Sequence, residues 1–207
     1  MEIGTSMTLN TQKIQSPKFN QLMKTAEDLF MRYGIRRVSI EEICKTANIS
    51  KMTFYKFFRN KNDLAFQLIV NIFDKGQVEF DDIISRDLPF SEKIELFIQF
   101  KLNYGKRFSK EFYQDIIGYT QEIHDFVLER SQQGIQQMKD LFREAQQKGE
   151  LKKDLNLEFL SFMLDHLLEL REDPRLLSIF PNMYELTRDW LNLFFYGVMA
   201  QDEQGNG

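Results

Sequence analysis

The sequence predicts an all-α protein, with an N-terminal three-helix helix-turn-helix domain followed by a helical-bundle domain. Apolar side chains recur at the spacing of amphipathic helices along most of the 207 residues. Only 10 Gly and 4 Pro are present, which argues against a turn-rich β fold. We expect the helix-turn-helix domain at residues 17–62 and the helical body at residues 63–200, between flexible termini at residues 1–16 and 201–207.

Residues 39–64 are the most informative segment, because they contain two short helices joined by a tight turn. Ser39 and Glu42 have the spacing of a capping box, which starts the first helix. Asn48 ends that helix, since asparagine tolerates the left-handed backbone conformation that a sharp turn needs. Ser50 then caps a second helix, Lys51–Phe58. The arrangement predicts a helix-turn-helix, which binds DNA.

The second of these helices has the composition of a DNA recognition helix. Phe54 and Phe58 lie four residues apart and are expected to pack inward. Cationic, hydroxylated, apolar and aromatic side chains remain on the outward face: Lys51, Met52, Thr53, Tyr55 and Lys56. Such side chains can pair with phosphates, hydrogen-bond to base edges and contact thymine methyls. Asn60 caps the next helix and places Lys61 at its N-terminus, where we expect a phosphate to bind.

Charge is distributed unevenly along the chain. Residues 13–65 contain 11 Lys and Arg but only 5 Asp and Glu, a net charge of +6, whereas residues 66–207 carry −9. The alternative is that these are ordinary amphipathic helices with solvated charged faces. A basic module on an acidic body favours one DNA-facing end, because a uniformly basic chain would attract nucleic acid over its whole surface.

From Leu22 to Leu68 the chain resembles the DNA-binding region of the tetracycline-repressor (TetR) family of bacterial transcriptional regulators. The segments that carry the resemblance are LMKTAEDLFMRYGIRRVSIEEICKTANIS and SKMTFYKFFRNKNDL. The resemblance implies that Thr53, Tyr55 and Lys61 contact the DNA backbone, and that Ser39 does so as well. Two residues of the outward helix face, Thr53 and Tyr55, are therefore assigned by the resemblance to contacts with the DNA backbone.

Two positions depart from that family. Asn48 stands where the family frequently has glycine in the turn, and Met52 stands where a small residue is common. Met52 is therefore expected to alter base preference or the tilt of the helix. Two-fold symmetric helical DNA-binding proteins address two half-sites, which requires a dimer. We expect the partner to be double-stranded palindromic operator DNA, bound by a homodimer.

The rest of the chain is expected to form a series of amphipathic helices. One runs from Asn60 toward Ile84 and is too long for the DNA-binding domain alone, so it should link that domain to the body, as the resemblance also implies. The other expected helices are Pro17–Tyr33, one opened by Ser91, Lys110–Ile117, Thr120–Lys148, Leu157–Arg171 and Leu176–Met199.

The last two helices carry wide apolar stripes. These stripes either close the core of one chain or pair in part with a second copy of the chain. The resemblance implies a four-helix dimer interface at this place, and we expect a homodimer. The expected dimerisation residues are Leu160, Leu164, Leu167, Trp190, Leu193 and Phe194.

The resemblance implies that the body, residues 63–200, binds a small-molecule effector as well as a second subunit. Aromatic residues make up 14% of the chain, with 20 Phe, which suits an apolar or aromatic molecule. The expected ligand-binding residues are Phe97, Lys101, Tyr104, Tyr119 and His166. The expected function is a transcriptional repressor that such an effector releases from its operator. The alternatives are a helix-turn-helix architectural or protein-interaction module with no small-molecule ligand, and a helical lipid carrier whose basic end is incidental.

Catalytic, metal and membrane signals are not apparent in the sequence. The two histidines lack metal-ligand spacing, and no phosphate loop or nucleophile elbow occurs, so we expect no enzyme, no metal site and no cofactor. The start of the chain lacks the features of a signal peptide, and no apolar run approaches the ~18–20 residues that span a bilayer. The single cysteine, Cys44, is expected to be a buried thiol of a cytoplasmic protein.

Overall fold

The computed structural model describes residues 16–171 and 173–196, and within this part the regular elements are all helices. The all-α fold class is therefore confirmed. The helices are α2 (Pro17–Tyr33), α3 (Ile40–Thr46), α4 (Lys51–Phe57), α5 (Lys61–Ser85), α6 (Phe90–Arg107), α7 (Lys110–Gly118), α8 (Gln121–Gln147), α9 (Leu157–Arg171), α10 (Pro174–Ile179) and α11 (Met183–Tyr196).

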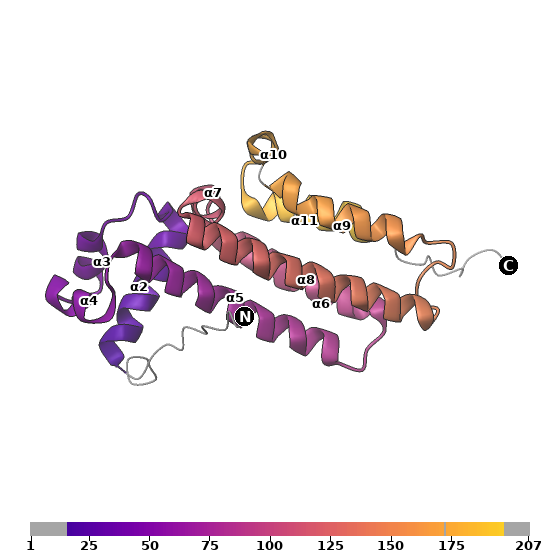
Figure 1. Ribbon diagram of the computed structural model, residues 1–207, viewed down its shortest axis with the longest axis horizontal. Coiled ribbons are helices and arrows are strands. Elements are labelled where there is room, and N and C mark those ends of the chain that lie inside the picture. Colours follow the sequence, from indigo (N-terminus) through magenta and orange to yellow (C-terminus); the bar gives the residue numbers. More distant parts are fainter. Residues whose placement is uncertain (1–15, 172, 197–207) are drawn as a thin grey trace, which may run out of the picture.

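Helices α2, α3 and α4 lie together at one end of an elongated molecule (Figure 1). Helix α2 begins with Pro17 in its first turn and ends at Gly34, whose φ of +83° favours glycine. The side chains of Phe54 and Phe58 are almost completely buried, at 0% and 1% exposure. Cys44 is also buried, as predicted. The three helices thus share one core, which fixes the orientation of α4.

The turn between α3 and α4 has the predicted caps. Ser39 Oγ accepts a hydrogen bond from the Glu42 N–H at 3.1 Å, and Ser50 Oγ accepts one from the Thr53 N–H at 3.2 Å. Asn48 adopts a positive φ of 50° between them. The helix-turn-helix geometry is therefore set by residues within the turn itself.

Helix α5 is one continuous helix from the helix-turn-helix end into the body, so the expected domain boundary between residues 62 and 63 falls inside it. Asn60 Oδ1 caps it by accepting from the Asp63 N–H at 2.9 Å. The core of the helix-turn-helix end does not stop at this boundary. It continues into α7 and α8 through Phe112, Ile116, Ile123 and Val127.

The body is a helical bundle in which α5 packs against α6 and α8, α9 packs along α8, and α11 packs along α6 (Figure 1). A second core, which includes Phe80, Ile94, Phe142 and Phe195, lies far from the helix-turn-helix. Helix α9 is also tied to α8 by an ion pair between Lys139 Nζ and Asp165 Oδ1 at 2.7 Å. None of the described helices is long and apolar enough to cross a membrane.

Two element boundaries differ from the sequence prediction. Helix α6 begins at Phe90 with Pro89 at its N-cap position, so Ser91 lies inside the first turn and does not open the helix. The Phe90 N–H donates to Glu150 Oε2 at 2.5 Å, so a carboxylate from a distant part of the chain takes the place of a local cap. A non-local partner of this kind has no signal in the local sequence.

The predicted helix Leu176–Met199 is two helices, α10 and α11. Pro181 lies in the connection and lacks the N–H that a continuous helix would use. Asn182 then caps α11 by accepting from the Glu185 N–H at 2.9 Å. Residues 197–199 of that prediction, and the flexible termini expected at 1–15 and 201–207, lie outside the described residues.

Candidate nucleic-acid interface

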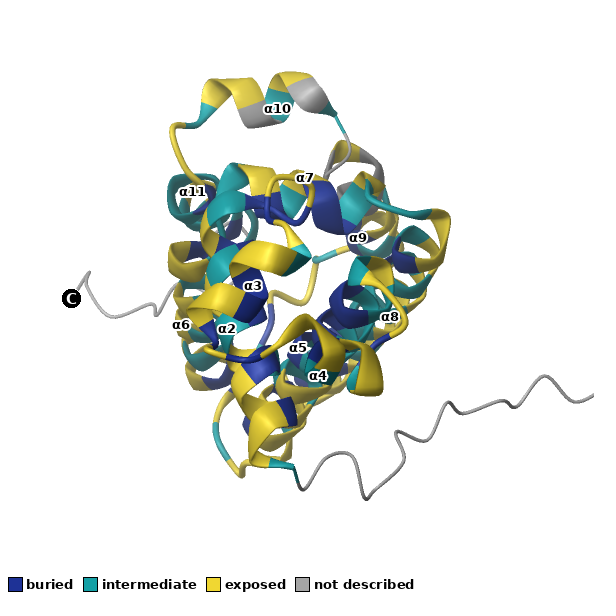
Figure 2. Cartoon of the chain, turned by 90° about the vertical axis from the view of Figure 1, so that its left-hand side faces the viewer, coloured by how far each residue is buried: buried dark blue, intermediate teal, exposed yellow. Residues whose placement is uncertain are grey.

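The outward face of α4 is exposed at the helix-turn-helix end of the molecule (Figure 2). Met52 is 71% exposed and Tyr55 is 55% exposed, which is unusual for an apolar and an aromatic side chain in a small helical core. Lys51 and Lys56 are exposed beside them. The Tyr55 ring rests edge-on against Phe54, with 5.3 Å between the centroids. The phenol is therefore supported from behind by a buried residue.

The two hydroxyl residues expected at the DNA backbone belong to helix caps. Thr53 is partly buried, and its Oγ1 lies 3.0 Å from Ser50 Oγ. Ser39 is exposed while its Oγ accepts the Glu42 N–H. Because both hydroxyls sit at helix N-termini, a phosphate bound there would also meet the partial positive charge of the helix dipole.

Lys51 pairs with Glu41 across the two short helices. Lys51 Nζ donates to Glu41 Oε1. This hydrogen bond lowers the pKa of the Glu41 carboxyl and raises the pKa of Lys51. Both side chains remain about half exposed, at 52% for Lys51 and 64% for Glu41. The pair is therefore weak and screened, and a phosphate can compete with Glu41 for the ammonium.

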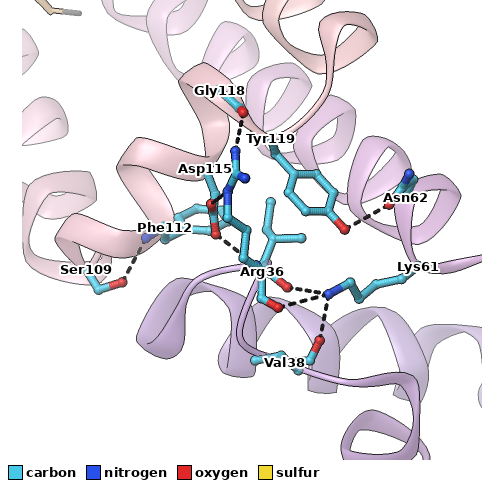
Figure 3. A network of polar contacts seen from close by, with 10 residues as sticks. Arg36, Val38, Lys61, Asn62, Ser109, Phe112, Asp115, Gly118 and Tyr119 are labelled. Carbon is cyan, nitrogen blue, oxygen red and sulfur yellow. Dashed lines mark hydrogen bonds and ion pairs between the residues drawn. The ribbon is translucent and has the colours of Figure 1, made fainter.

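Lys61, which was expected to bind a phosphate, binds backbone carbonyl oxygens in this structure. Its Nζ donates to the carbonyl oxygens of Ile35 at 2.8 Å, Arg36 at 3.2 Å and Val38 at 3.0 Å (Figure 3). Burial lowers the pKa of Lys61. All three protons of the ammonium are used in this conformation, so Lys61 holds the α2–α3 loop in place.

A polar junction connects this loop to α7, and the sequence did not indicate it (Figure 3). Asp115 is a buried carboxylate with 4% exposure. It accepts from the Arg36 backbone N–H at 2.9 Å and from Arg36 Nε at 2.7 Å. Arg36 Nη2 also donates to the Gly118 carbonyl. Gly34 packs here as well, because a Cβ on Gly34 would lie 2.9 Å from Asp115 Oδ2.

Tyr119, an expected ligand-binding residue, lies in the same junction. Its hydroxyl donates to Asn62 Oδ1 at 2.8 Å, which joins the end of α7 to the first turn of α5. The Arg36 guanidinium and the Lys61 ammonium each lie 5.7 Å from the centre of its ring. Burial raises the pKa of Tyr119. Tyr119 therefore connects the helix-turn-helix end to the body.

The other expected ligand-binding residues lie in the body. Phe97, Lys101 and Tyr104 are all on α6. The ring of Phe100 lies between those of Phe97 and Tyr104, with its centroid 6.2 Å from that of Phe97 and 5.1 Å from that of Tyr104. His166 lies on α9, and its Nδ1 is 2.9 Å from the Phe162 carbonyl of the same helix. The structure thus groups the three α6 residues and places Tyr119 elsewhere.

The expected dimerisation residues fall into two sets. Leu160 and Leu164 are buried within the core of the chain itself, with exposures of 5% and 4%, so they are covered before any partner binds. Trp190 and Phe194 are partly buried, and the side chain of Leu167 lies outside the described part of the chain. Leu193 is 79% exposed.

Other apolar residues of α9 are exposed and were not in the expected set. These are Phe159 at 63%, Phe162 at 56%, Met163 at 37% and Leu170 at 41%. They repeat at the helical spacing of three and four residues, which is the sequence signal that could have identified them. Among the described residues no group of His, Cys, Asp and Glu is placed to hold a metal ion.

The geometry defines a class of protein: a capped helix-turn-helix with an exposed second helix, attached through one long helix to a helical body. Residues 22–68 match the family model described as bacterial regulatory proteins of the tetR family. Residues 22–68 are therefore similar to the DNA-binding module of the tetR family, and this match covers under a quarter of the chain.

Known relatives agree with this assignment. An uncharacterized HTH-type transcriptional regulator of Bacillus subtilis (strain 168), YhgD, is 26% identical over 73 residues, which cover 35% of this chain and 38% of the relative. The match therefore spans well under half the length of that relative.

Solved structures are similar to this chain over most of its length. A TetR-family transcriptional regulator from Streptomyces coelicolor has a TM-score of 0.67 and 17% identity, covering 89% of this chain and 95% of the other. The transcriptional regulator FadR from Bacillus subtilis, solved in complex with stearoyl-CoA, has a TM-score of 0.61 and 17% identity, covering 86% and 98%. At these identities the likeness concerns the fold.

Proposed function

We propose that the chain is a sequence-specific DNA-binding transcriptional regulator, a repressor that a small apolar or aromatic effector releases from its operator. The observation that carries the proposal is the outward face of α4, where Met52, Tyr55 and two lysines are exposed on a helix that a rigid core holds in place. The positive charge of residues 13–65 supports it, because phosphate attraction is then confined to one end.

In the proposed complex α4 enters the major groove. Lys51, Met52 and Lys56 contact base edges, while Ser39, Thr53 and Tyr55 contact phosphates. Lys61 acts from behind by ordering the α2–α3 loop through its three carbonyl contacts. A phosphate could reach Lys61 only if one of these contacts were released.

The operator is proposed to be palindromic and the protein to be a homodimer. A two-fold dimer presents two α4 helices to two half-sites. The exposed apolar side chains of α9 and of Leu193 on α11 support an interface there, because a stripe of this kind is unfavourable in water. Leu160 and Leu164 would then support the interface from inside each subunit.

The body is proposed to bind the effector and to pass the effect to α4. The fold likeness to a FadR solved with stearoyl-CoA supports a ligand-responsive body. Helix α5 and the junction of Arg36, Asp115 and Tyr119 connect the body to the DNA-binding end. The protein is proposed to act by binding alone, without catalysis, and in the cytoplasm where chromosomal DNA is accessible.

Selection of bound duplexes from random DNA by the full-length protein tests this function. We expect enrichment of one palindromic sequence, which should bind on the order of a thousandfold more tightly than scrambled duplex. Fluorescence anisotropy with labelled duplexes provides the affinities. Failure to enrich any sequence, with equal affinity for selected and scrambled DNA, would contradict the proposal.

A further inference from the structure

Lys101 lies on the inward face of α6. At 3.6 residues per turn, it shares this face with Ile94, Phe97 and Gly105. Ile94 and Gly105 are buried. The same face packs on α11, where the ring of Phe97 meets that of Phe195 with 5.9 Å between the centroids. Lys101 therefore places a cation between two buried positions on the face that packs on α11.

The contacts of Lys101 are aromatic. Its Nζ lies 5.3 Å from the ring centre of Phe97 and 5.2 Å from that of Phe100. No ion pair or hydrogen bond joins this ammonium to any side chain in the part of the chain that the structure describes. Two π faces compensate only a fraction of the lost hydration of a cation.

Two other lysines of the body, Lys93 and Lys139, have oxygen partners. Lys93, which is only 7% exposed, donates from Nζ to the Ile84 carbonyl at 2.8 Å. Lys139 pairs with Asp165 at 2.7 Å. These two lysines each have an oxygen acceptor, whereas the contacts of the Lys101 ammonium are with aromatic rings.

Solvent reaches the inward face at this level. Lys101 is exposed, and no residue of α6 from 95 to 104 is buried, although both ends of the helix are covered. At the same time the surrounding protein desolvates the ammonium and lowers the pKa of Lys101 to about 8. Near neutral pH most of the lysine is still protonated, so a cation accessible to solvent lies in the bundle, and no carboxylate of residues 16–171 and 173–196 pairs with it.

We propose that Lys101 binds the anionic group of the effector, and that the effector is an apolar molecule carrying one carboxylate or similar anion. The inference rests on the proposed effector-binding function and specifies its ligand class. The anion replaces the missing counter-ion of Lys101, and the apolar part lies along the rings of Phe97, Phe100 and Tyr104.

The position of Lys101 beside Phe100 also explains how binding of such a ligand could affect the DNA-binding end. Phe100 and Tyr104 face Gly76 of α5, since a Cβ on Gly76 would lie 3.6 Å from Phe100 Cζ and 3.8 Å from Tyr104 Oη. A ligand that shifts either ring therefore acts on α5, the helix whose first turn carries Lys61 and Asn62. Phe100 thus contacts both the Lys101 ammonium and α5, the link between the two parts.

Two fluorescent probes with the same aromatic skeleton test the proposal on the full-length protein. Anilinonaphthalene sulfonate carries an anionic group, and phenylnaphthylamine does not. We expect wild type to bind the sulfonate at least about tenfold more tightly than the neutral probe. Dodecanoate should displace the sulfonate, and dodecanamide should displace it much less.

The variants Lys101→Met, Lys101→Arg and Lys106→Met assign the preference to one side chain. Lys101→Met should abolish the preference for the anion, and Lys101→Arg should retain it. Lys106→Met is the matched control, because Lys106 is also on α6 and also lies over a ring, that of Tyr184 at 5.2 Å. A second readout is thermal unfolding, where Lys101→Met should unfold at the same or a higher temperature, since the uncompensated ammonium is removed.

The outcomes separate this inference from the proposed function. Equal binding of both probes to wild type and Lys101→Met would overturn the anion site, whether or not wild type binds its selected operator. Binding of neither probe would overturn it as well. The operator titration with wild type, run in parallel, reports on DNA binding independently.

Discussion

Tyr55 illustrates how a single exposed side chain separates affinity from specificity. The phenol is 55% exposed and rests on Phe54, so it can reach a phosphate without rearrangement. We expect Tyr55→Ala to weaken binding to selected and scrambled duplexes by the same factor, about 1.5–3 kcal/mol for a lost hydrogen bond to a charged group. Anisotropy titrations on both duplexes measure it.

The control for Tyr55→Ala is Tyr55→Phe, which keeps the ring and removes the hydroxyl. If the phosphate contact is made by the hydroxyl, the two variants should bind DNA equally weakly. Both should unfold at the wild-type temperature, because substitutions at an exposed position cost little stability. Full affinity of a folded Tyr55→Ala protein would mean that α4 does not contact the DNA at this residue.

At the scale of helices, the junction between the α2–α3 loop and α7 depends on Asp115. This carboxylate is buried and accepts both the backbone N–H and the side chain of Arg36. We expect Asp115→Asn to lower the free energy of unfolding by about 1–3 kcal/mol, because asparagine has one acceptor oxygen where Asp115 uses two. Arg36→Met should cost less, since the Arg36 side chain is 62% exposed and its ion pair is screened.

Chemical denaturation of the two single variants and the double variant measures this junction. The double variant should be less destabilised than the sum of the single changes, which identifies a direct interaction between the two side chains. Strict additivity would show that Arg36 and Asp115 stabilise the protein independently of each other.

Helices α9 and α11 provide the second prediction at this scale. Leu193→Glu should produce monomers, because a charge placed in an apolar interface has no partner to offset its desolvation. Val78→Glu is the matched control, since Val78 is also a strongly exposed aliphatic residue, at 69%, but lies on α5. Analytical ultracentrifugation should show a dimer for wild type and Val78→Glu. A dimeric Leu193→Glu protein would place the interface elsewhere.

The sequence predicted those features that depend on neighbouring residues. Ser39, Asn48 and Ser50 act within one or two turns of the chain, so the caps and the turn could be derived from spacing. The junction could not, because Arg36 and Asp115 are 79 residues apart and neither has a distinctive local pattern.

The missed features in the body have two different causes. Pro181 indicates a helix break, but the apolar pattern continues on both sides of it and predicts one helix where there are two. The stripe of α9 was ambiguous for a physical reason. Its apolar residues cover more than one face, and the sequence does not tell which of Leu160 or Phe159 turns toward the core.

At the scale of the whole molecule, operator and effector are expected to oppose each other. Both act on α5, so a compound that favours one arrangement of the DNA-binding end must lose affinity when DNA holds the other. We expect an effector to weaken operator binding by about 5–150-fold, and the operator to weaken effector binding by the same factor. Calorimetric titration of the compound into free protein and into the protein–operator complex measures both. Equal affinity in the two titrations would show that the compound does not regulate DNA binding.

The base-preference profile of α4 tests the central claim most directly. Affinities of wild type and Lys56→Gln are measured for the selected duplex and for every single-base variant of it. We expect Lys56→Gln to lose about 1–3 kcal/mol of discrimination at one position in each half-site and to keep wild-type preferences elsewhere. An unchanged profile, or a uniform loss at all positions, would contradict the assignment of α4 as the helix that reads the DNA sequence.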